Sequence, residues 1–359
     1  MESVLLVIGG GQGDVGGNVV VVVLIVAVAL IFDFCNGFHD SANSIATLVA
    51  TRVLSPHYAV IWAAFFNFAA VFLLGLKVAG TIANDIIDPH AASTMVVFSA
   101  LFGAIAWDLI TWRVGIPSSS SHALIGGFLG GGLAVGGPSV VNWGGLTMPI
   151  LGIVLAPSLC LGMGYLLMLS LLWICRNHHA GRVNNLFKKL QFVAAAIYSI
   201  SHGANDAQKT IGIIAALLVG ERLLIPRGST MTPEEIPFWI VILAFMAITL
   251  GTLSGGWRIV KTMGSGITKL GPVDGFAAAT AGGVLIMGFT EIGLPVSTTH
   301  SIAGSIMGVG ATKRLSAVRW GVSGRIVCAW VLTIPVSAAL AVLCYWVTAL
   351  CVKTYGWLS

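Results

Sequence analysis

The stretch "LQFVAAAIYSISHGANDAQKTIGIIAALLVG", residues 190–220, decides the fold. Polar side chains, an aspartate and a lysine among them, fill its middle, and apolar residues fill both flanks. The whole stretch is longer than the roughly 20 residues that a helix needs to cross a hydrocarbon core. Ionisable side chains at that depth are costly, and they mark ion or substrate pathways. The stretch therefore predicts a membrane-embedded segment that lines a pathway.

The composition of the chain agrees with this prediction. Hydrophobic types make up 57% of the 359 residues and charged types only 9%, against about 25% charged residues in typical soluble domains. Mean hydropathy is +0.96. The apolar runs are continuous and do not alternate as strands of a membrane barrel would, so we expect an all-α, multi-pass membrane protein. The runs long enough to span a bilayer cover residues 19–32 with their continuation past the motif that follows, 57–76, 93–112, 147–174, 237–256 and 326–352.

The net charge of +5 comes from basic residues in loops and does not indicate a nucleic-acid partner. Four of them crowd one central linker, and the positive-inside rule places that linker in the cytoplasm. They are Arg176, Arg182, Lys188 and Lys189.

The chain repeats itself around that linker. Three motifs recur in the same order in both halves, which predicts a duplication: residues 1–175 form a first repeat, 176–190 a short linker and 191–359 a second repeat. Matched polar or Gly/Pro-broken segments are the best sequence sign of a transporter's binding site, and in that class the repeats are inverted. The motif pairs are "GFHDSANSIATLVA" (37–50) with "GANDAQKTIGIIAA" (203–216), "GLKVAGTI" (75–82) with "GWRIVKTM" (256–263), and "GIPSSSSHALIGGFLG" (115–130) with "GLPVSTTHSIAGSIMG" (293–308).

The third motif pair predicts two re-entrant hairpins. Pro117 and Pro295 break a helix interior but suit a first helical turn, and the hydroxyl residues after them favour helix N-caps. A helix that begins there directs free N–H groups at an anion, phosphate above all. The alternative is a hydroxyl-lined contact between helices. His122 and His300 would cap or orient these hydroxyls. The predicted anion ligands are Ser118, Ser119, Ser120, Ser121, Ser297, Thr298 and Thr299.

The first motif pair predicts a site for a cation or a proton. Asp40 and Asp206 each lie in an apolar stretch and have carboxamides beside them, and such oxygen ligands suit hard cations. Gly37 and Gly203 would permit an unwound backbone there. The alternatives are a structural ion pair and a side chain that reaches from a helix end to the interface. The neighbouring amides are Asn36, Asn43, Asn205 and Gln208, and the neighbouring histidines are His39 and His202, which could titrate.

At these residues the chain resembles the inorganic phosphate transporter (Pit) family, over nearly its whole length. "NGFHDSANSIATLVATR" and "SHGANDAQKTIGII" look like the duplicated family signature, and the GFHD form is most similar to bacterial members. The resemblance implies an inverted-repeat helical fold, often a homodimer, that carries phosphate with a coupling cation. Its bacterial form implies the inner membrane of a bacterium. It places Asp40, Asp206, Asn43 and Asn205 at the cation and phosphate site.

Two departures from the family pattern are present. The second motif has Gln208-Lys209-Thr210 where animal-type members repeat an Ala-Asn pattern, and the central loop is short. The first departure argues against a sodium site, and the resemblance to bacterial members implies proton coupling, with phosphate carried partly as a neutral metal complex. Lys209 aligns with Asn43, so we expect its ammonium close to Asp206, as a tethered cation or as a donor to phosphate.

We therefore expect a secondary active phosphate symporter of two inverted repeats with discontinuous helices. No ATP-binding motif is present, so a proton or sodium gradient would supply the energy, with no other cofactor and no resident metal. The rival substrate is another tetrahedral oxyanion such as sulfate. The rival of another class is an intramembrane hydrolase, which would need no matched hairpins, and no nucleophile–base motif is evident. The expected partners are phosphate, the coupling cation, the lipid bilayer and a second copy of the chain.

Overall fold

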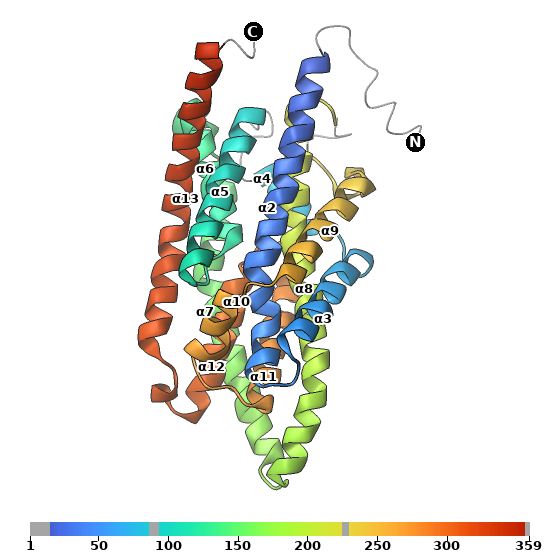
Figure 1. Ribbon diagram of the computed structural model, residues 1–359, viewed down its shortest axis with the longest axis vertical. Coiled ribbons are helices and arrows are strands. Elements are labelled where there is room, and N and C mark those ends of the chain that lie inside the picture. The colour runs from blue at the N-terminus through green and yellow to red at the C-terminus, as the bar shows by residue number, and fades with distance from the viewer. Residues whose placement is uncertain (1–14, 86–92, 225–229, 356–359) are drawn as a thin grey trace.

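The computed structural model describes residues 15–85, 93–224 and 230–355, and these residues form an elongated bundle of helices without a β-strand (Figure 1). The part of the predicted first repeat before residue 15 lies outside the described residues. The helices of the first half are α2 (Val15–Ala50), α3 (Pro56–Ala69), η1 (Ala70–Phe72), α4 (Lys77–Asp85), α5 (Thr94–Val114), α6 (Ser120–Gly136), η3 (Gly137–Val140) and α7 (Trp143–Cys175). Those of the second half are α8 (Ala180–Gly220), η4 (Pro233–Glu235), α9 (Phe238–Ser254), α10 (Trp257–Lys261), the π-helical η5 (Thr262–Gly266), α11 (Pro272–Glu291), α12 (Thr298–Lys313), η6 (Leu315–Ala317) and α13 (Trp320–Tyr355).

The helices are long and apolar enough for a membrane. Six of those described could each cross one, and the number rises to eight if two bent helix pairs each count as one span. Large apolar side chains such as Val154, Leu166 and Leu350 face outward, as a protein surrounded by lipid tails requires. The prediction of an all-α, multi-pass protein is confirmed.

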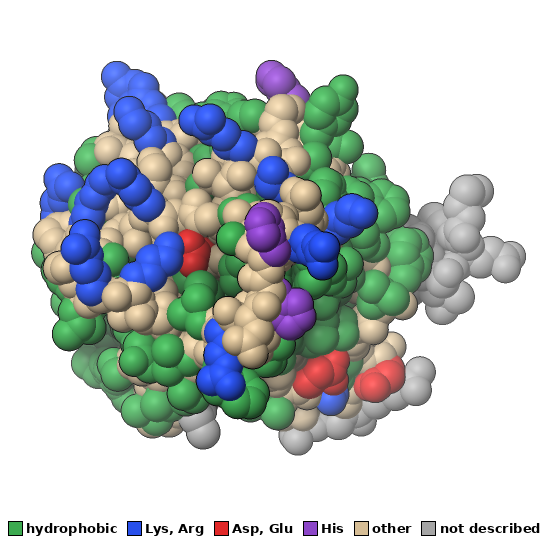
Figure 2. All heavy atoms as spheres, turned by 90° about the horizontal axis from the view of Figure 1, so that it is seen from below, with side chains coloured by type: hydrophobic (Ala, Val, Ile, Leu, Met, Phe, Trp, Pro, Cys, Tyr) green, Lys and Arg blue, Asp and Glu red, His purple; other side chains and the backbone are tan. Residues whose placement is uncertain are grey.

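The two ends of the bundle differ in the segments they carry. The start of α2 and the end of α13 lie at the upper end of Figure 1, and the turn between α7 and α8 lies at the lower end. Helix α2 therefore runs downward, whereas α8 runs upward. In the view from below, Lys and Arg side chains gather over the lower face (Figure 2). This distribution suits the predicted cytoplasmic position of the linker, which stays a prediction.

Helices α2 and α8 are continuous through the aspartate motifs, so the expected unwound backbone at Gly37 and Gly203 is wrong. The two glycines serve close packing instead. A Cβ on Gly37 would lie 2.1 Å from the carbonyl oxygen of Ile248 in α9, and one on Gly203 would lie 2.6 Å from that of Asn67 in α3. Each motif helix thus touches the backbone of a helix in the other half, which holds both aspartates against the bundle axis.

The breaks occur in the hydroxyl-rich motifs. Helix α5 ends at Gly115 (φ 74°) and α11 ends just before Gly293 (φ 77°), and helices α6 and α12 begin only after an extended segment. Pro117 and Pro295 lie in these segments, ahead of the N-caps, and not in the first helical turn as we expected. Proline favours extended backbone before it, which suits a segment that reverses the chain.

The last helix of each half supports the broken helix of the other half. Helix α6 packs along α13, and α12 packs along α7. A Cβ on Gly130 would meet the Ala338 carbonyl oxygen at 2.2 Å, and one on Gly308 would meet that of Leu161 at 2.0 Å. These equivalent glycines allow backbone contact. Because each broken helix packs on the last helix of the other half, the N-termini of α6 and α12 come together in the interior.

Candidate functional site

The N-termini of α6 and α12 meet at the centre of the site. The hydroxyl oxygens of Ser119 and Ser297 each accept a hydrogen bond of 3.2 Å from the backbone N–H of the histidine three residues later. These are N-caps, which leave each serine one O–H to donate. The rings of those residues, His122 and His300, stack with centroids 4.7 Å apart. The histidines thus lie behind the caps, and the positive ends of two helix dipoles converge.

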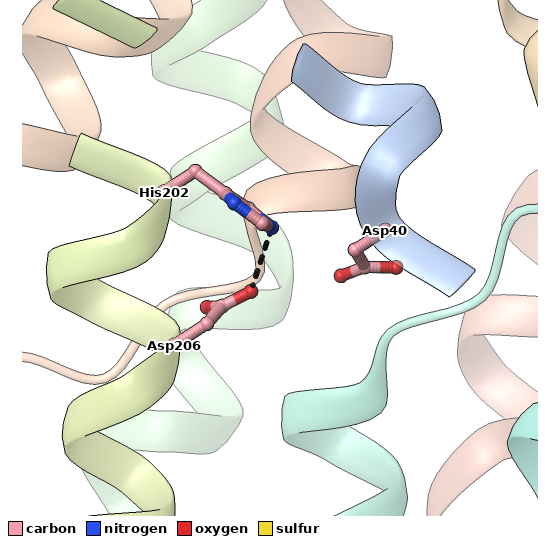
Figure 3. Close-up of side chains that lie close together, drawn as sticks. All are labelled: Asp40, His202 and Asp206. Carbon is pink, nitrogen blue, oxygen red and sulfur yellow. Dashed lines mark ion pairs between the residues drawn. The ribbon is translucent and has the colours of Figure 1, made fainter. Parts of the chain in front are cut away.

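The two motif aspartates face each other across this point (Figure 3). The hydroxyl oxygen of Thr298 lies 3.4 Å from Asp40 Oδ2 and 3.1 Å from Asp206 Oδ2. Thr299 Oγ1 donates to Asp40 Oδ1 at 3.3 Å and accepts from Asn43 Nδ2 at 2.8 Å. All five side chains are buried. One helix start therefore bridges the two carboxylates of α2 and α8.

Lys209 supplies a buried positive charge. Its ammonium donates to Asp206 Oδ1 at 2.6 Å and to the Val296 carbonyl oxygen at 2.8 Å, and it also contacts the hydroxyl of Ser121. Ser121 in turn donates to the same carbonyl at 3.3 Å. The expected closeness of Lys209 to Asp206 is confirmed. Lys209 therefore links Asp206 to the first turn of α6 and to the extended segment before α12.

A histidine accompanies each aspartate. His39 Nδ1 lies 2.6 Å from Asp40 Oδ1, and its Nε2 lies 3.2 Å from the Thr111 hydroxyl. His202 Nε2 lies 3.3 Å from Asp206 Oδ2, and Figure 3 shows this pair with Asp40 opposite. Both histidines are fully buried, so each can hold its aspartate in place.

The site combines groups for a cation with groups for an anion. Ligand atoms of Asp40, His202 and Asp206 all lie within 4.8 Å of one another, which is compact enough for a metal ion. The Asn43 and Asn205 carbonyl oxygens nearby have no hydrogen-bond partner among the described residues. Helix N-termini and Lys209 favour an anion in the same place. Such a mixture suits an anion that enters together with a cation.

Comparisons with known proteins agree with this geometry. The sequence profile of the phosphate transporter family matches residues 36–341. A probable low-affinity inorganic phosphate transporter of Rhizobium meliloti is 54% identical over 89% of this chain and 94% of its own length. One of Bacillus subtilis is 42% identical over 91% and 97%. This chain belongs to the phosphate transporter family. The predicted family is confirmed.

A solved structure extends the likeness to three dimensions. The sodium-dependent phosphate transporter superposes with a TM-score of 0.82 and 27% identity, over 92% of this chain and 99% of that one. The protein is thus an integral membrane transporter and not an enzyme, so the hydrolase alternative is excluded.

Some predicted site residues of this transporter lie outside the central cluster. The side chain of Gln208 forms hydrogen bonds with backbone groups: its Oε1 accepts from Val78 N at 2.9 Å and its Nε2 donates to Gly75 O at 2.7 Å. Asn205 donates to the Thr290 hydroxyl at 2.8 Å. Both amides hold neighbouring segments in place in this structure.

Three other predicted residues lie at the edge of the cluster. Ser118 pairs with Thr111 at 2.8 Å and faces His39. The hydroxyl of Ser120 and the carbonyl oxygen of Asn36 are buried without a partner in the described part of the chain. Their predicted ligand roles stay predictions.

Sequence reasoning missed several polar residues around the cluster. Asn67 Oδ1 lies 3.2 Å from His202 Nδ1, and Tyr198 donates its hydroxyl to the Thr298 carbonyl oxygen at 3.0 Å. Asp33 and Asp108 are fully buried carboxylates. Asp108 stands out in the sequence as an ionisable residue near an apolar segment, without an assigned role. The rule that led to Asp40, a charge inside an apolar run, would have found Asp33 too. Nothing in the sequence singles out Tyr198.

Proposed function

We propose that this transporter is a secondary active symporter that imports inorganic phosphate, driven by a cation gradient, with the proton favoured over sodium. The observation that carries the proposal is the position of Lys209, whose ammonium joins Asp206 to the breaks before α6 and α12. Phosphate bound there meets a fixed positive charge, two helix N-termini and hydroxyl donors. Each of these groups favours a tetrahedral oxyanion.

The same lysine favours the proton as coupling ion. In the first half the corresponding position is Asn43, an amide that can offer its oxygen to a cation. In the second half a tethered ammonium stands 2.6 Å from the Asp206 carboxylate, where a free cation would otherwise balance the charge. One of two equivalent cation positions is therefore filled by the protein. The term "sodium-dependent" in the related structure's title belongs to that protein.

A divalent metal that travels with phosphate belongs to the same proposal. Asp40, Asp206 and His202 would offer it two carboxylates and an imidazole, which are common ligands of such ions. The metal would be part of the cargo and would leave with the phosphate.

The proposed architecture is a pair of inverted repeats with two re-entrant hairpins. Three observations support it: α2 and α8 run in opposite directions, the breaks of both halves meet in the interior, and helices exchange partners between halves (Figure 1). Backbone that is not helical survives at membrane depth when it is buried in protein or lines a wet cavity. The division at residues 175 and 190 and the homodimer implied by the family remain parts of this proposal.

Purified protein in sealed liposomes tests the function. Labelled phosphate should accumulate inside under an inward proton gradient, weakly or not at all under a sodium gradient alone, and sulfate should compete poorly. Empty liposomes and the variant Asp206→Asn are the controls, and neither should accumulate phosphate. Accumulation of sulfate in place of phosphate, or indifference to both gradients, would overturn the proposal.

A further inference from the structure

Asp33 is a buried carboxylate that lies outside the phosphate cluster, by which we mean Asp40, Asp206, Lys209, Thr298 and Thr299. It lies on α2 two helical turns before Asp40, and no hydrogen bond of good geometry reaches either of its oxygens among the described residues, although the side chains of Thr210 and Asn36 lie close enough to interact with them. Its exposed fraction is 0%. Asp33, Asn36, Asp40 and Asn43 follow the three- and four-residue spacing of one helix face. The polar stripe of α2 therefore continues beyond the cluster toward the upper end of Figure 1, where α2 begins.

Two other polar side chains accompany Asp33. Asn36 lies one turn along the same face, Thr210 of α8 lies beside the carboxylate, and both are close enough to interact with it. The Asn36 carbonyl oxygen and the Thr210 hydroxyl are buried, and no hydrogen bond of good geometry reaches them among the described residues. Buried polar atoms that lack a well-formed hydrogen bond are uncommon in native proteins. Here they collect at one place.

Lys209 does not neutralise Asp33. An ammonium has three N–H donors, and those of Lys209 contact Asp206, Ser121 and Val296. The charged groups that act on Asp33 from the elements around α2 are Asp206, which repels it, and Lys209, which attracts it, both in α8. A buried carboxylate without its own counter-charge is unstable in the membrane interior. It needs a cation of its own.

We propose that Asp33, Asn36 and Thr210 form a second site, which binds the monovalent coupling cation, a proton or a sodium ion. This inference rests on the proposed symport. The carboxylate, amide and hydroxyl oxygens are the ligands that hard cations take, and a proton on Asp33 would donate to one of the other two oxygens. The site lies next to the turn of α8 that carries Lys209. A cation there offsets the Asp33 charge while phosphate occupies the cluster.

The variant Asp33→Asn tests the site in proteoliposomes. Phosphate–phosphate exchange at equal pH and equal sodium needs no net cation movement, so it should persist at the parental rate. Accumulation driven by an imposed gradient should be lost. Proton and sodium gradients are applied separately, and the gradient that no longer drives uptake identifies the ion. Thr210→Val, which keeps the shape of the side chain but removes its oxygen, should lower the accumulation of phosphate under the same gradient that Asp33→Asn no longer uses.

Ser199→Ala is the matched control. Ser199 stands four residues before Gly203 as Asp33 stands four before Gly37, and its hydroxyl is also buried and unpartnered among the described residues. It should accumulate phosphate like the parent. Parental accumulation by Asp33→Asn under both gradients would overturn the second site. So would loss of exchange in a variant that elutes as folded protein, because Asp33 would then belong to the phosphate site. A parent protein that fails to exchange phosphate would instead refute the proposed function, and this inference with it.

Discussion

Lys209 occupies in α8 the position that Asn43 occupies in α2, and its three contacts link Asp206 with the hydroxyl-rich motifs of both halves. We expect Lys209→Asn to impair phosphate uptake driven by a proton gradient and to introduce a dependence on sodium. The physical reason is that the Asp206 carboxylate, without its tethered ammonium, needs a free cation. Lys209→Arg should restore little, because a planar guanidinium does not replace a compact ammonium.

The measurement for Lys209 is the initial rate of phosphate uptake in proteoliposomes with each gradient imposed alone. Lys209→Asn uptake at the parental rate under a proton gradient would show that the lysine has no part in coupling. The lysine would then be a structural ion pair.

Thr298 has a single hydroxyl proton within reach of two carboxylates, at 3.4 and 3.1 Å. We expect Thr298→Val to weaken phosphate binding by about 1.5–3 kcal/mol, the range for a lost hydrogen bond to a charged group. Two carboxylates that lose their shared donor repel each other and the anion more strongly. Calorimetric titration of purified protein with phosphate measures the change. Ser301→Ala is the control, since Ser301 donates to the carbonyl oxygen of Ser297, the N-cap of its helix, and no hydrogen bond among the described residues joins it to either carboxylate. Equal affinities of Thr298→Val and the parent would remove Thr298 from the site.

Residue types and repeats were enough to predict Asp40, Asp206 and Lys209, because buried charge in an apolar run has few structural uses. They did not reveal the direction in which an amide points. Gln208 lies two residues after Asp206, yet its side chain binds the backbone of the segment that leads into α4. Contacts from distant helices, such as those of Asn67 and Tyr198, depend on packing that one sequence does not display.

At the scale of elements, proline and glycine predicted where the helices break, but glycine alone was misleading. Gly115 and Gly293 end helices in the left-handed region, whereas Gly37 lies in a continuous helix against Ile248. A glycine in such a motif can either end a helix or allow close packing within one, and the neighbouring helix decides which of the two occurs. The sequence also did not reveal the bends of 80° after α3 and 62° after α9.

Gly308 tests the exchange of helices between halves. A Cβ there would lie 2.0 Å from the Leu161 carbonyl oxygen, so Gly308→Ala must push α12 away from α7. Overpacking of this kind costs about 1–3 kcal/mol. We expect a lower melting temperature in detergent and weaker phosphate binding, because α12 carries Thr298 and Thr299. Gly162→Ala is the control, since a Cβ on Gly162 meets nothing within 4 Å. Equal melting temperatures for the two variants would contradict the close contact.

At the scale of the whole molecule, each half holds the helix break of the other half by hydrogen bonds. Thr81 in α4 donates to the Gly293 carbonyl oxygen at 2.8 Å. Thr262, which aligns with Thr81 in the second half, donates to the Gly115 carbonyl oxygen at 2.8 Å. Lys77 and Arg258 add matching bonds to the carbonyl oxygens of Glu291 and Arg113. Helix α4 lies above α10 in Figure 1, so the two sets of hydrogen bonds lie at different heights along the bundle.

A transporter of this class exposes its site to one side at a time, and with both sets of bonds made, the side chains of the site are buried. We expect Thr81→Val to favour opening toward the upper end and Thr262→Val toward the lower end. A hydrogen bond of about 1 kcal/mol shifts such an equilibrium about fivefold. A single cysteine at Ser120, in a chain without its native cysteines, reports the change through its labelling by an impermeant thiol reagent applied to each side of oriented vesicles. Ser120→Cys alone is the reference. The two variants should change the ratio of labelling from the two sides in opposite directions, and the double variant should return toward the reference, because the two shifts oppose each other. A shift in the same direction for both would mean that the two sets of hydrogen bonds are static joints and not gates.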